Sequence, residues 1–329
     1  MALLFVFTRR QLFSLADCVL VVLFAAFPST AQEPLRAHAE VLGASAPFTY
    51  PQEVIVGPDR NLYFLDPVLS SIFIHDLKTG KVRRLCGPES LASPSGIAVG
   101  ARGQLWVLSQ RESKVRRLSP RCAVQAEFKV SLIARKIATN AFGELIVLNT
   151  TGRSLFDLFS ADGKLLRSFG EFTDYGEEIT TQELNNGKIA PDSSGGFFFS
   201  FNYPPLVRHY SRTGRLLSEF KPESDVPIAP PNIIVGGSGG SVSVTAKYQL
   251  LVLDIAADNQ DRLYLLISGK NVAPALQQGT PKLRVLTKTG RTLKNLTLDH
   301  SFHRLAAGNK SLYLLRNREP FRVDEYVVF

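Results

Sequence analysis

The sequence predicts an all-β fold, namely one six-bladed β-propeller made of four-stranded antiparallel blades. A pattern of four short apolar segments, each bounded by Gly, Asp, Asn or Pro, recurs six times along the chain. The last copy ends one segment short, and an unassigned β-rich segment precedes the first copy. A single closed ring therefore accounts for the length of 329 residues better than two separate domains do.

The first two copies show the pattern most plainly. The predicted strands are 52–56, 61–66, 71–74 and 80–85 in blade one, and 95–99, 104–108, 114–118 and 123–128 in blade two. Later copies begin near Lys136, Lys188, Asp254 and Arg304. Turns such as Asp162-Gly163 are expected to join the last two strands of a blade, because glycine adopts positive φ without steric cost.

The two ends of the chain are expected to close the ring together. The sixth copy stops at 326–329, which would be its third strand. The segment Ala37 to Leu42 alternates well enough to supply the missing fourth strand. Such pairing would leave no open sheet edge in the ring.

The beginning of the chain has the pattern of an export signal. Two arginines precede an apolar stretch from Leu12 to Phe27, and small residues follow as far as Ala31. We therefore expect residues 1–31 to form a cleaved signal peptide and 32–329 to form the single propeller domain. A retained anchor is the alternative, but a spanning helix needs roughly 20 apolar residues, and the uninterrupted run here is shorter. The mature protein would then be periplasmic or extracellular, with no transmembrane segment.

The net charge belongs to the predicted propeller. The whole chain carries +9, and cleavage would remove two arginines and one aspartate, which leaves +8. Such a charge often indicates nucleic-acid binding, but export excludes nucleic acid from the expected partners. Basic pairs such as Arg83-Arg84 and Arg116-Arg117 fall on predicted third and fourth strands, at the outer rim. We expect a solvated rim there, with a polyanionic envelope surface as the alternative partner.

Two cysteines remain after signal cleavage. Cys86 and Cys122 form an even pair in an oxidising compartment, which favours a disulfide. However, Cys86 ends the predicted outer strand of blade one, whereas Cys122 precedes that of blade two. Opposite ends of six-residue strands lie roughly 20 Å apart, beyond the ~7 Å Cα separation that a disulfide allows. We therefore expect the two thiols to be unbonded.

The second copy resembles a known repeat. Ser93-Pro94-Ser95-Gly96-Ile97-Ala98-Val99, followed by Gly103-Gln104-Leu105-Trp106-Val107, resembles the NHL repeat. The predicted mature chain as a whole is similar to bacterial six-bladed NHL or TolB-like propellers. The resemblance implies the fold, but that family includes scaffolds, ligand binders and a few enzymes. Blades four to six depart from it, since Phe197-Phe198-Phe199 replaces the usual Leu-Tyr-Val.

The extra residues of the chain lie between blades three and five. Three insertions, Gly170 to Asn186, Lys221 to Leu251 and Gly269 to Lys282, are expected to emerge on one face of the disc. Long loops on a rigid scaffold often bind ligands. The first insertion contains the acidic and aromatic candidates for ligand binding, which are Asp174, Tyr175, Glu177 and Glu178. Loops that only cap the disc are the structural alternative.

A second set of candidates opens the innermost strands and is expected to ring the channel mouth. It consists of Glu53, Gly96, Lys136, Lys188, Asp254 and Arg304. Lys136, Lys188 and Arg304 could bind a sugar acid or a phosphate. Alternatively, Glu53 and Asp254 could hold Ca²⁺ or another divalent cation through carboxylate oxygens. An ion network that neutralises itself would give neither site.

These observations favour an exported, monomeric binding or scaffolding protein that needs no cofactor. Its partner would be a protein, a carbohydrate or an anionic ligand, bound at the face that carries the insertions. The alternative is a metal-dependent hydrolase or lyase of the lactonase-like propeller type, with Glu53 and Asp254 at the channel. No arrangement of histidines or cysteines in the sequence indicates a catalytic residue.

Overall fold

The structure is a computed structural model that describes residues 37–43, 46–223, 231–236, 243–247, 250–268, 281–316 and 319–327. The expected signal peptide at 1–31 lies outside these residues. Within the described part of the chain, no helix has both the length and the apolar character that a membrane crossing requires.

Six four-stranded antiparallel sheets form the blades, as the sequence predicts. Blade one contains β2 (Glu53–Val56), β3 (Leu62–Asp66), β4 (Ser71–Asp76) and β5 (Lys81–Cys86). Blade two contains β6 (Gly96–Val99), β7 (Leu105–Ser109), β8 (Lys114–Leu118) and β9 (Val124–Lys129). Blade three contains β10 (Ala134–Thr139), β11 (Leu145–Asn149), β12 (Phe156–Phe159) and β13 (Leu165–Phe169). Each sheet follows the order of its strands in the chain.

The remaining blades follow the same plan until the last. Blade four contains β14 (Gly187–Pro191), β15 (Phe197–Phe201), β16 (Val207–Tyr210) and β17 (Leu216–Phe220). Blade five contains β20 (Val252–Ala257), β21 (Leu263–Ile267), β22 (Lys282–Leu286) and β23 (Thr292–Thr297). Blade six contains β24 (Phe302–Ala307), β25 (Ser311–Arg316), β26 (Val323–Val327) and, as its outer strand, β1 (Ala39–Leu42). The predicted closure of the ring by the N-terminal strand is therefore confirmed.

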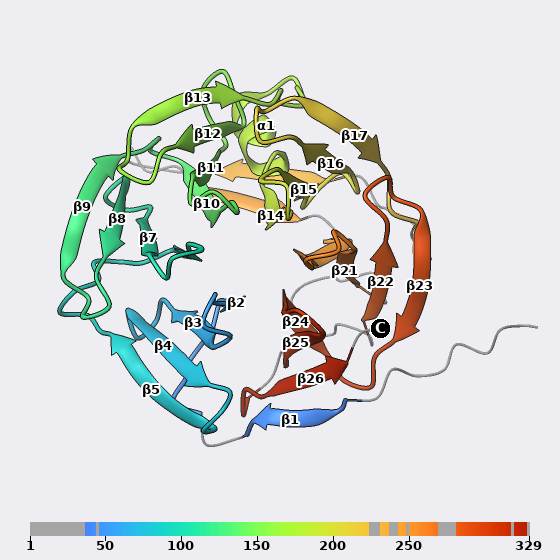
Figure 1. The fold of residues 1–329 in the computed structure, drawn as a ribbon. Helices are drawn as coiled ribbons and strands as arrows, with labels where there is room; N and C mark the ends of the chain where they lie inside the picture. The colour runs from blue at the N-terminus through green and yellow to red at the C-terminus, as the bar shows by residue number, and fades with distance from the viewer. Residues whose placement is uncertain are drawn as a thin grey trace, which may run out of the picture. The chain divides into compact units, whose positions relative to one another are not determined.

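The innermost strands surround a central opening (Figure 1). Each contacts the innermost strand of the next blade, and β24 contacts β2, which completes the ring. The second strands β3, β7, β11, β15 and β21 are buried along their whole length. They lie between neighbouring blades and are covered on both faces, which explains their continuous apolar sequences, including Phe197-Phe198-Phe199.

The outermost strands run in one sense around the rim, so that the end of each approaches the start of the next (Figure 1). At three junctions an aromatic side chain covers a glycine turn. Phe128 lies over Gly163, Phe169 over Gly214 and Phe220 over Gly290, and all three glycines have positive φ. The predicted glycine turns therefore serve a second purpose. The absence of a Cβ makes room for the phenylalanine side chain from the preceding blade.

The junction of blades one and two carries a disulfide. Cys86 and Cys122 are bonded, with Cα atoms 5.6 Å apart, so the expectation of free thiols is wrong. The 20 Å separation would hold only if the outer strands ran parallel to the channel. Strands in a sheet rotate by about 20–25° from one to the next, so a fourth strand is turned roughly 60–75° from the first. The end of β5 consequently reaches the turn that precedes β9.

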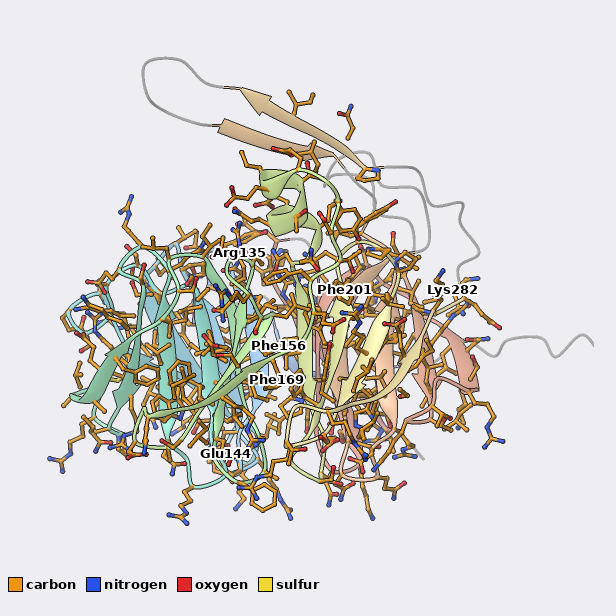
Figure 2. The ribbon with its side chains drawn as sticks, turned by 90° about the horizontal axis from the view of Figure 1, so that it is seen from above. Arg135, Glu144, Phe156, Phe169, Phe201 and Lys282 are labelled. Carbon is orange, nitrogen blue, oxygen red and sulfur yellow. A yellow bond between two sulfur atoms is a disulfide. The ribbon has the colours of Figure 1, made fainter. Side chains whose placement is uncertain are left out.

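Insertions rise from one face of the disc (Figure 2). The first contains α1 (Glu178–Leu184), and the second contains the hairpin of β18 (Asn232–Gly236) and β19 (Ser243–Lys247). Most of the third insertion, 269–280, lies outside the described residues. We call this side the insertion face. The opposite side, which carries the tight turns within each blade, is called the turn face.

Candidate ligand-binding site at the channel mouth

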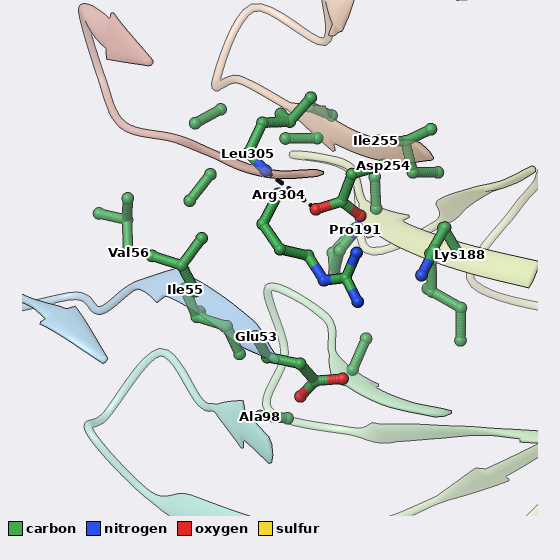
Figure 3. Close-up of a pocket in the computed structure, with 18 of the residues that line it drawn as sticks. Glu53, Ile55, Val56, Ala98, Lys188, Pro191, Asp254, Ile255, Arg304 and Leu305 are labelled. Carbon is green, nitrogen blue, oxygen red and sulfur yellow. Dashed lines mark hydrogen bonds between the residues drawn. The ribbon is translucent and has the colours of Figure 1, made fainter. Parts of the chain in front are cut away.

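A cavity of about 260 Å³ occupies the centre of the ring (Figure 3). Its wall is formed by the innermost strands of all six blades. A charged side chain lies among the first three residues of five of these strands, and alanine lies two residues after the aligned position in five of the six strands. These alanines are Ala98, Ala138, Ala190, Ala256 and Ala306. Small side chains leave the channel open beneath a charged mouth, which lies on the insertion face.

Glu53 and Lys136 meet across blade two. The Lys136 ammonium donates to Glu53 Oε1, although the two residues belong to blades one and three. The residue at the corresponding position of blade two is Gly96, so no side chain stands between them. Glu53 Oε2 also accepts a hydrogen bond from the backbone nitrogen of Ile97 at 2.8 Å. Both oxygens of this carboxylate are therefore engaged within the protein.

Asp254 and Arg304 lie close to each other but bond to the backbone. Asp254 Oδ2 accepts a hydrogen bond from the backbone nitrogen of Leu305 at 2.9 Å. Arg304 donates to the carbonyl oxygens of Gln52 and His303. No ion pair of Arg304 occurs among the described residues, and its guanidinium group projects into the cavity (Figure 3). Backbone contacts thus fix the direction of a cation whose charge no carboxylate neutralises directly.

Lys188 is a second basic side chain in the cavity that lacks an ion-pair partner among the described residues. Its side chain lies in the cavity near Asp254 and Arg304 (Figure 3), and its amine makes neither a hydrogen bond nor an ion pair within the described chain. Burial, followed by the positive charges of Arg304 and Lys136, holds the pKa of the Lys188 amine well below its usual value. Asp254 and Glu53 act in the opposite direction, but their effect is smaller. An anion in the cavity would relieve this repulsion.

The buried residue His303 lies next to Arg304 and contacts the backbone just before Glu53. Nε2 of His303 donates to the carbonyl oxygen of Pro51 at 3.3 Å. Burial and the adjacent Arg304 lower the pKa of His303 to about 3, so the ring is neutral at physiological pH. His303 was not among the residues predicted from the sequence to form the site. Its position directly before Arg304 is the signal that could have indicated it.

The acidic candidates lie in the first insertion and mainly stabilise that insertion. Glu177 caps α1 by accepting from the backbone nitrogen of Thr180 at 3.0 Å. Asp174 accepts from the backbone nitrogen of Gly176, and Glu178 accepts from the side-chain amide of Gln182. The backbone nitrogen of Tyr175 donates to Thr181 Oγ1. None of the four residues lines the cavity, whereas Lys136, Lys188 and Arg304 all do.

The insertion is also tied to the channel wall. Arg135, which precedes Lys136 on β10, forms an ion pair with Glu183 of α1 at 2.6 Å. Asn185, which is fully buried, donates through its amide to the carbonyl oxygens of Thr173 and Thr181. The ion pair joins the helix to the blade that supplies Lys136, and the hydrogen bonds of Asn185 stabilise the insertion itself. Neither Arg135 nor Asn185 was predicted from the sequence to have these roles, because each occupies an ordinary polar position there.

The two faces of the disc differ in charge. Among the described residues, ten exposed cations lie in the turns of the turn face, namely Arg60, Lys78, Lys81, Arg102, Arg121, Lys164, Arg212, Arg215, Arg291 and Lys310. Two exposed acids accompany them, Asp59 and Asp162. The loops of the insertion face expose nine acids, which are Glu89, Glu112, Glu171, Asp174, Glu177, Glu178, Glu223, Asp299 and Glu319. They expose four cations, Arg111, Lys129, Arg153 and Lys221.

Comparisons with known proteins identify the fold and no family. No protein-family model matches the chain, and no curated protein matches it. The structure is similar to that of virginiamycin B lyase from Staphylococcus aureus, with a TM-score of 0.54 and 12% identity, over 86% of this chain and 83% of the other. It is also similar to a gluconolactonase from Xanthomonas campestris, with a TM-score of 0.51 and 11% identity, over 90% and 95%. At these identities the similarity establishes a six-bladed propeller and nothing more specific.

Proposed function

We propose that the protein is an exported, monomeric propeller of the NHL or TolB-like type that binds a small anionic ligand at the channel mouth. The observation that carries this proposal is the pair of basic side chains, Lys188 and Arg304, that face the cavity without an ion-pair partner among the described residues. The acidic loop residues beside the mouth would contact the less charged parts of a ligand or a protein partner. Binding of this kind requires no cofactor.

A sugar acid fits the site in size and charge. The cavity of about 260 Å³ is slightly smaller than pockets for drug-sized ligands, which begin near ~300 Å³. A carboxylate can accept hydrogen bonds from an ammonium and a guanidinium group at once. The carboxylate of Asp254 lines the same cavity and could accept from a sugar hydroxyl through the oxygen that does not bond to Leu305.

A matched pair of sugars tests the proposal by titration calorimetry. D-Glucuronate should bind, and D-glucose, which lacks the carboxylate, should bind at least ten-fold more weakly. Lys188→Met should weaken glucuronate binding by about ten-fold or more, because it removes a charged hydrogen bond. Lys310→Met, which removes an exposed cation on the turn face, serves as the control and should have no effect. Equal affinity of Lys188→Met and the unmodified protein would contradict the proposal.

The pH dependence of binding follows from Lys188. Its pKa is lowered, so the amine loses its proton at a lower pH than an ordinary lysine does. The charged form binds the anion, so affinity should fall as the pH rises through this lowered pKa, and proton uptake should accompany binding above it. Lys188→Arg retains its charge at all these pH values and should abolish the dependence. Affinities measured between pH 5 and 9 provide the test.

The metal-dependent hydrolase or lyase is the second candidate. Glu53 and Asp254 line one cavity, as that function would require. Both carboxylates are engaged in internal hydrogen bonds, and the described residues include no group of three or more His, Cys, Asp or Glu placed to hold a metal ion. The residues as arranged therefore do not fit a divalent cation. A stoichiometric metal ion in the purified protein, lost in Glu53→Ala and Asp254→Ala, would favour this second function.

Export is supported by the disulfide. Bonded cysteines persist in oxidising compartments and are rare in the cytosol, and Cys86–Cys122 is such a bond. A signal peptide over residues 1–31 would place the protein in the periplasm or outside the cell. Mass spectrometry of the protein isolated from the envelope tests this, since cleavage near Ala31 should remove the first 31 residues.

A further inference from the structure

The edge of the turn face repeats one exposed motif in three consecutive blades. A turn glycine is followed by a cation and, two residues after the cation, by leucine, as in Gly163-Lys164-Leu165-Leu166, Gly214-Arg215-Leu216-Leu217 and Gly290-Arg291-Thr292-Leu293. Because the three outer strands have the same register relative to their turns, equivalent residues occupy equivalent places on the rim. The three copies therefore recur at equivalent points of the rim in blades three, four and five.

The leucines of this edge are exposed to solvent. Leu166, Leu217 and Leu293 occupy matching positions of the three outer strands, and each is 43% exposed. A single exposed leucine is ordinary, but leucines exposed at the same position of three consecutive blades repeat one apolar feature along one edge, as an extended interaction surface would require. Phe142, in a neighbouring turn of the same face, is 57% exposed.

The cations of the edge are available to a partner. Lys164, Arg215 and Arg291 are exposed, and their charged groups form no ion pair among the described residues. The surrounding turn face is strongly basic, whereas the insertion face is acidic. This distribution orients the disc with its turn face toward any negatively charged surface. It also leaves the insertion face and the channel mouth directed away from that surface.

We propose that the turn face, along blades three to five, docks on an anionic phospholipid bilayer. Basic side chains would contact lipid phosphates, and the leucines would enter the boundary between headgroups and acyl chains. A polysaccharide or another soluble polyanion would complement the charges but would leave the leucines exposed to water. The combination of both features at one edge therefore favours a lipid surface.

Vesicle sedimentation with the full chain tests the proposal. Vesicles of phosphatidylcholine with about one third phosphatidylglycerol should bind the protein, and binding should weaken steeply as salt is raised. Pure phosphatidylcholine vesicles report any contribution of the apolar N-terminal residues, which would act on both compositions. Binding to both compositions with equal affinity would overturn the proposal.

Three matched variants separate the surface from the net charge. Lys164→Glu/Arg215→Glu/Arg291→Glu should weaken binding to anionic vesicles at least ten-fold. The control Arg111→Glu/Arg153→Glu/Lys221→Glu makes the same change in net charge on the insertion face and should stay within about two-fold of the unmodified protein. Leu166→Ser/Leu217→Ser/Leu293→Ser should weaken binding several-fold at constant charge. Equal losses in the two charge variants, or no loss in the leucine variant, would overturn the proposal.

Discussion

The junction between blades one and two differs chemically from the next three junctions of the rim. The residue six positions after the turn residue of each outer strand is Cys86 in blade one, and Phe128, Phe169 and Phe220 in the next three blades. Each of these residues reaches the turn of the following blade. There Cys86 meets Cys122, whereas the three phenylalanines meet glycines.

The disulfide and the phenylalanine–glycine contacts occupy equivalent positions in the backbone. Cys122 has a φ of +63°, in the region where the other turns have glycine. Cys86 and Cys122 are both buried, whereas the three phenylalanines and the glycines that they cover are partly buried. The comparison shows that a propeller junction needs a filled space between one strand end and the next turn. An aromatic ring over a glycine fills it without a chemical bond, and a disulfide fills it with one.

Removing the disulfide should have the largest effect on stability. Cys86→Ala/Cys122→Ala opens a loop with a sequence separation of 36 residues, for which loop entropy gives a loss of about 4 kcal/mol in the free energy of unfolding. Urea denaturation of the oxidised protein and the variant measures this difference. Reductant should destabilise the unmodified protein and leave the variant unchanged. An unchanged urea midpoint for Cys86→Ala/Cys122→Ala would show that the disulfide does not stabilise this junction.

An aromatic junction can be broken with a single methyl group. A Cβ at Gly163 would lie 2.5 Å from the ring of Phe128, whereas a Cβ at Gly103 would have no atom within 4 Å. Both glycines have positive φ, so alanine strains the backbone by about 1 kcal/mol at either position. Gly163→Ala should lose a further 1–3 kcal/mol, approximately, through overpacking. Equal melting temperatures for the Gly163→Ala and Gly103→Ala variants would show that the packing of Phe128 does not require glycine at position 163.

Most of the fold could be predicted from the sequence because each blade repeats one pattern. The buried second strands, the glycine turns and the closing strand Ala39–Leu42 all follow from apolar segments and their punctuation. The disulfide could not be predicted from the strand order alone. Its geometry depends on twist accumulated over three strand pairs, which no local pattern records. Counting six residues from each turn would have revealed that Cys86 occupies a phenylalanine position.

At the channel mouth, too, the sequence predicts which residues lie together but not which contacts they make. The alignment of the repeats places Glu53, Lys136, Lys188, Asp254 and Arg304 at one level of the ring, and the cavity contains all five. The pairing of Glu53 with Lys136 depends on side-chain reach across Gly96, and the orientation of Arg304 depends on backbone carbonyls. Such contacts are set by three-dimensional positions, so the sequence left open which cation remains unpaired. Whether these residues bind a ligand stays a prediction.

Exchanging one junction for the other should have the smallest effect. Cys86→Phe/Cys122→Gly places the aromatic solution in the junction of blades one and two. Glycine relieves about 1 kcal/mol of strain at a φ of +63°, and the ring can fill part of the space left by the sulfur atoms. The exchange variant should therefore be about 1–2 kcal/mol more stable than Cys86→Ala/Cys122→Ala, and still less stable than the oxidised protein. Cys86→Phe/Cys122→Ala is the control, because its Cβ should meet the ring as in Gly163→Ala. Equal free energies of unfolding for this control and the exchange variant would show that the glycine of the aromatic junctions has no role in packing. The two kinds of junction would then not be equivalent.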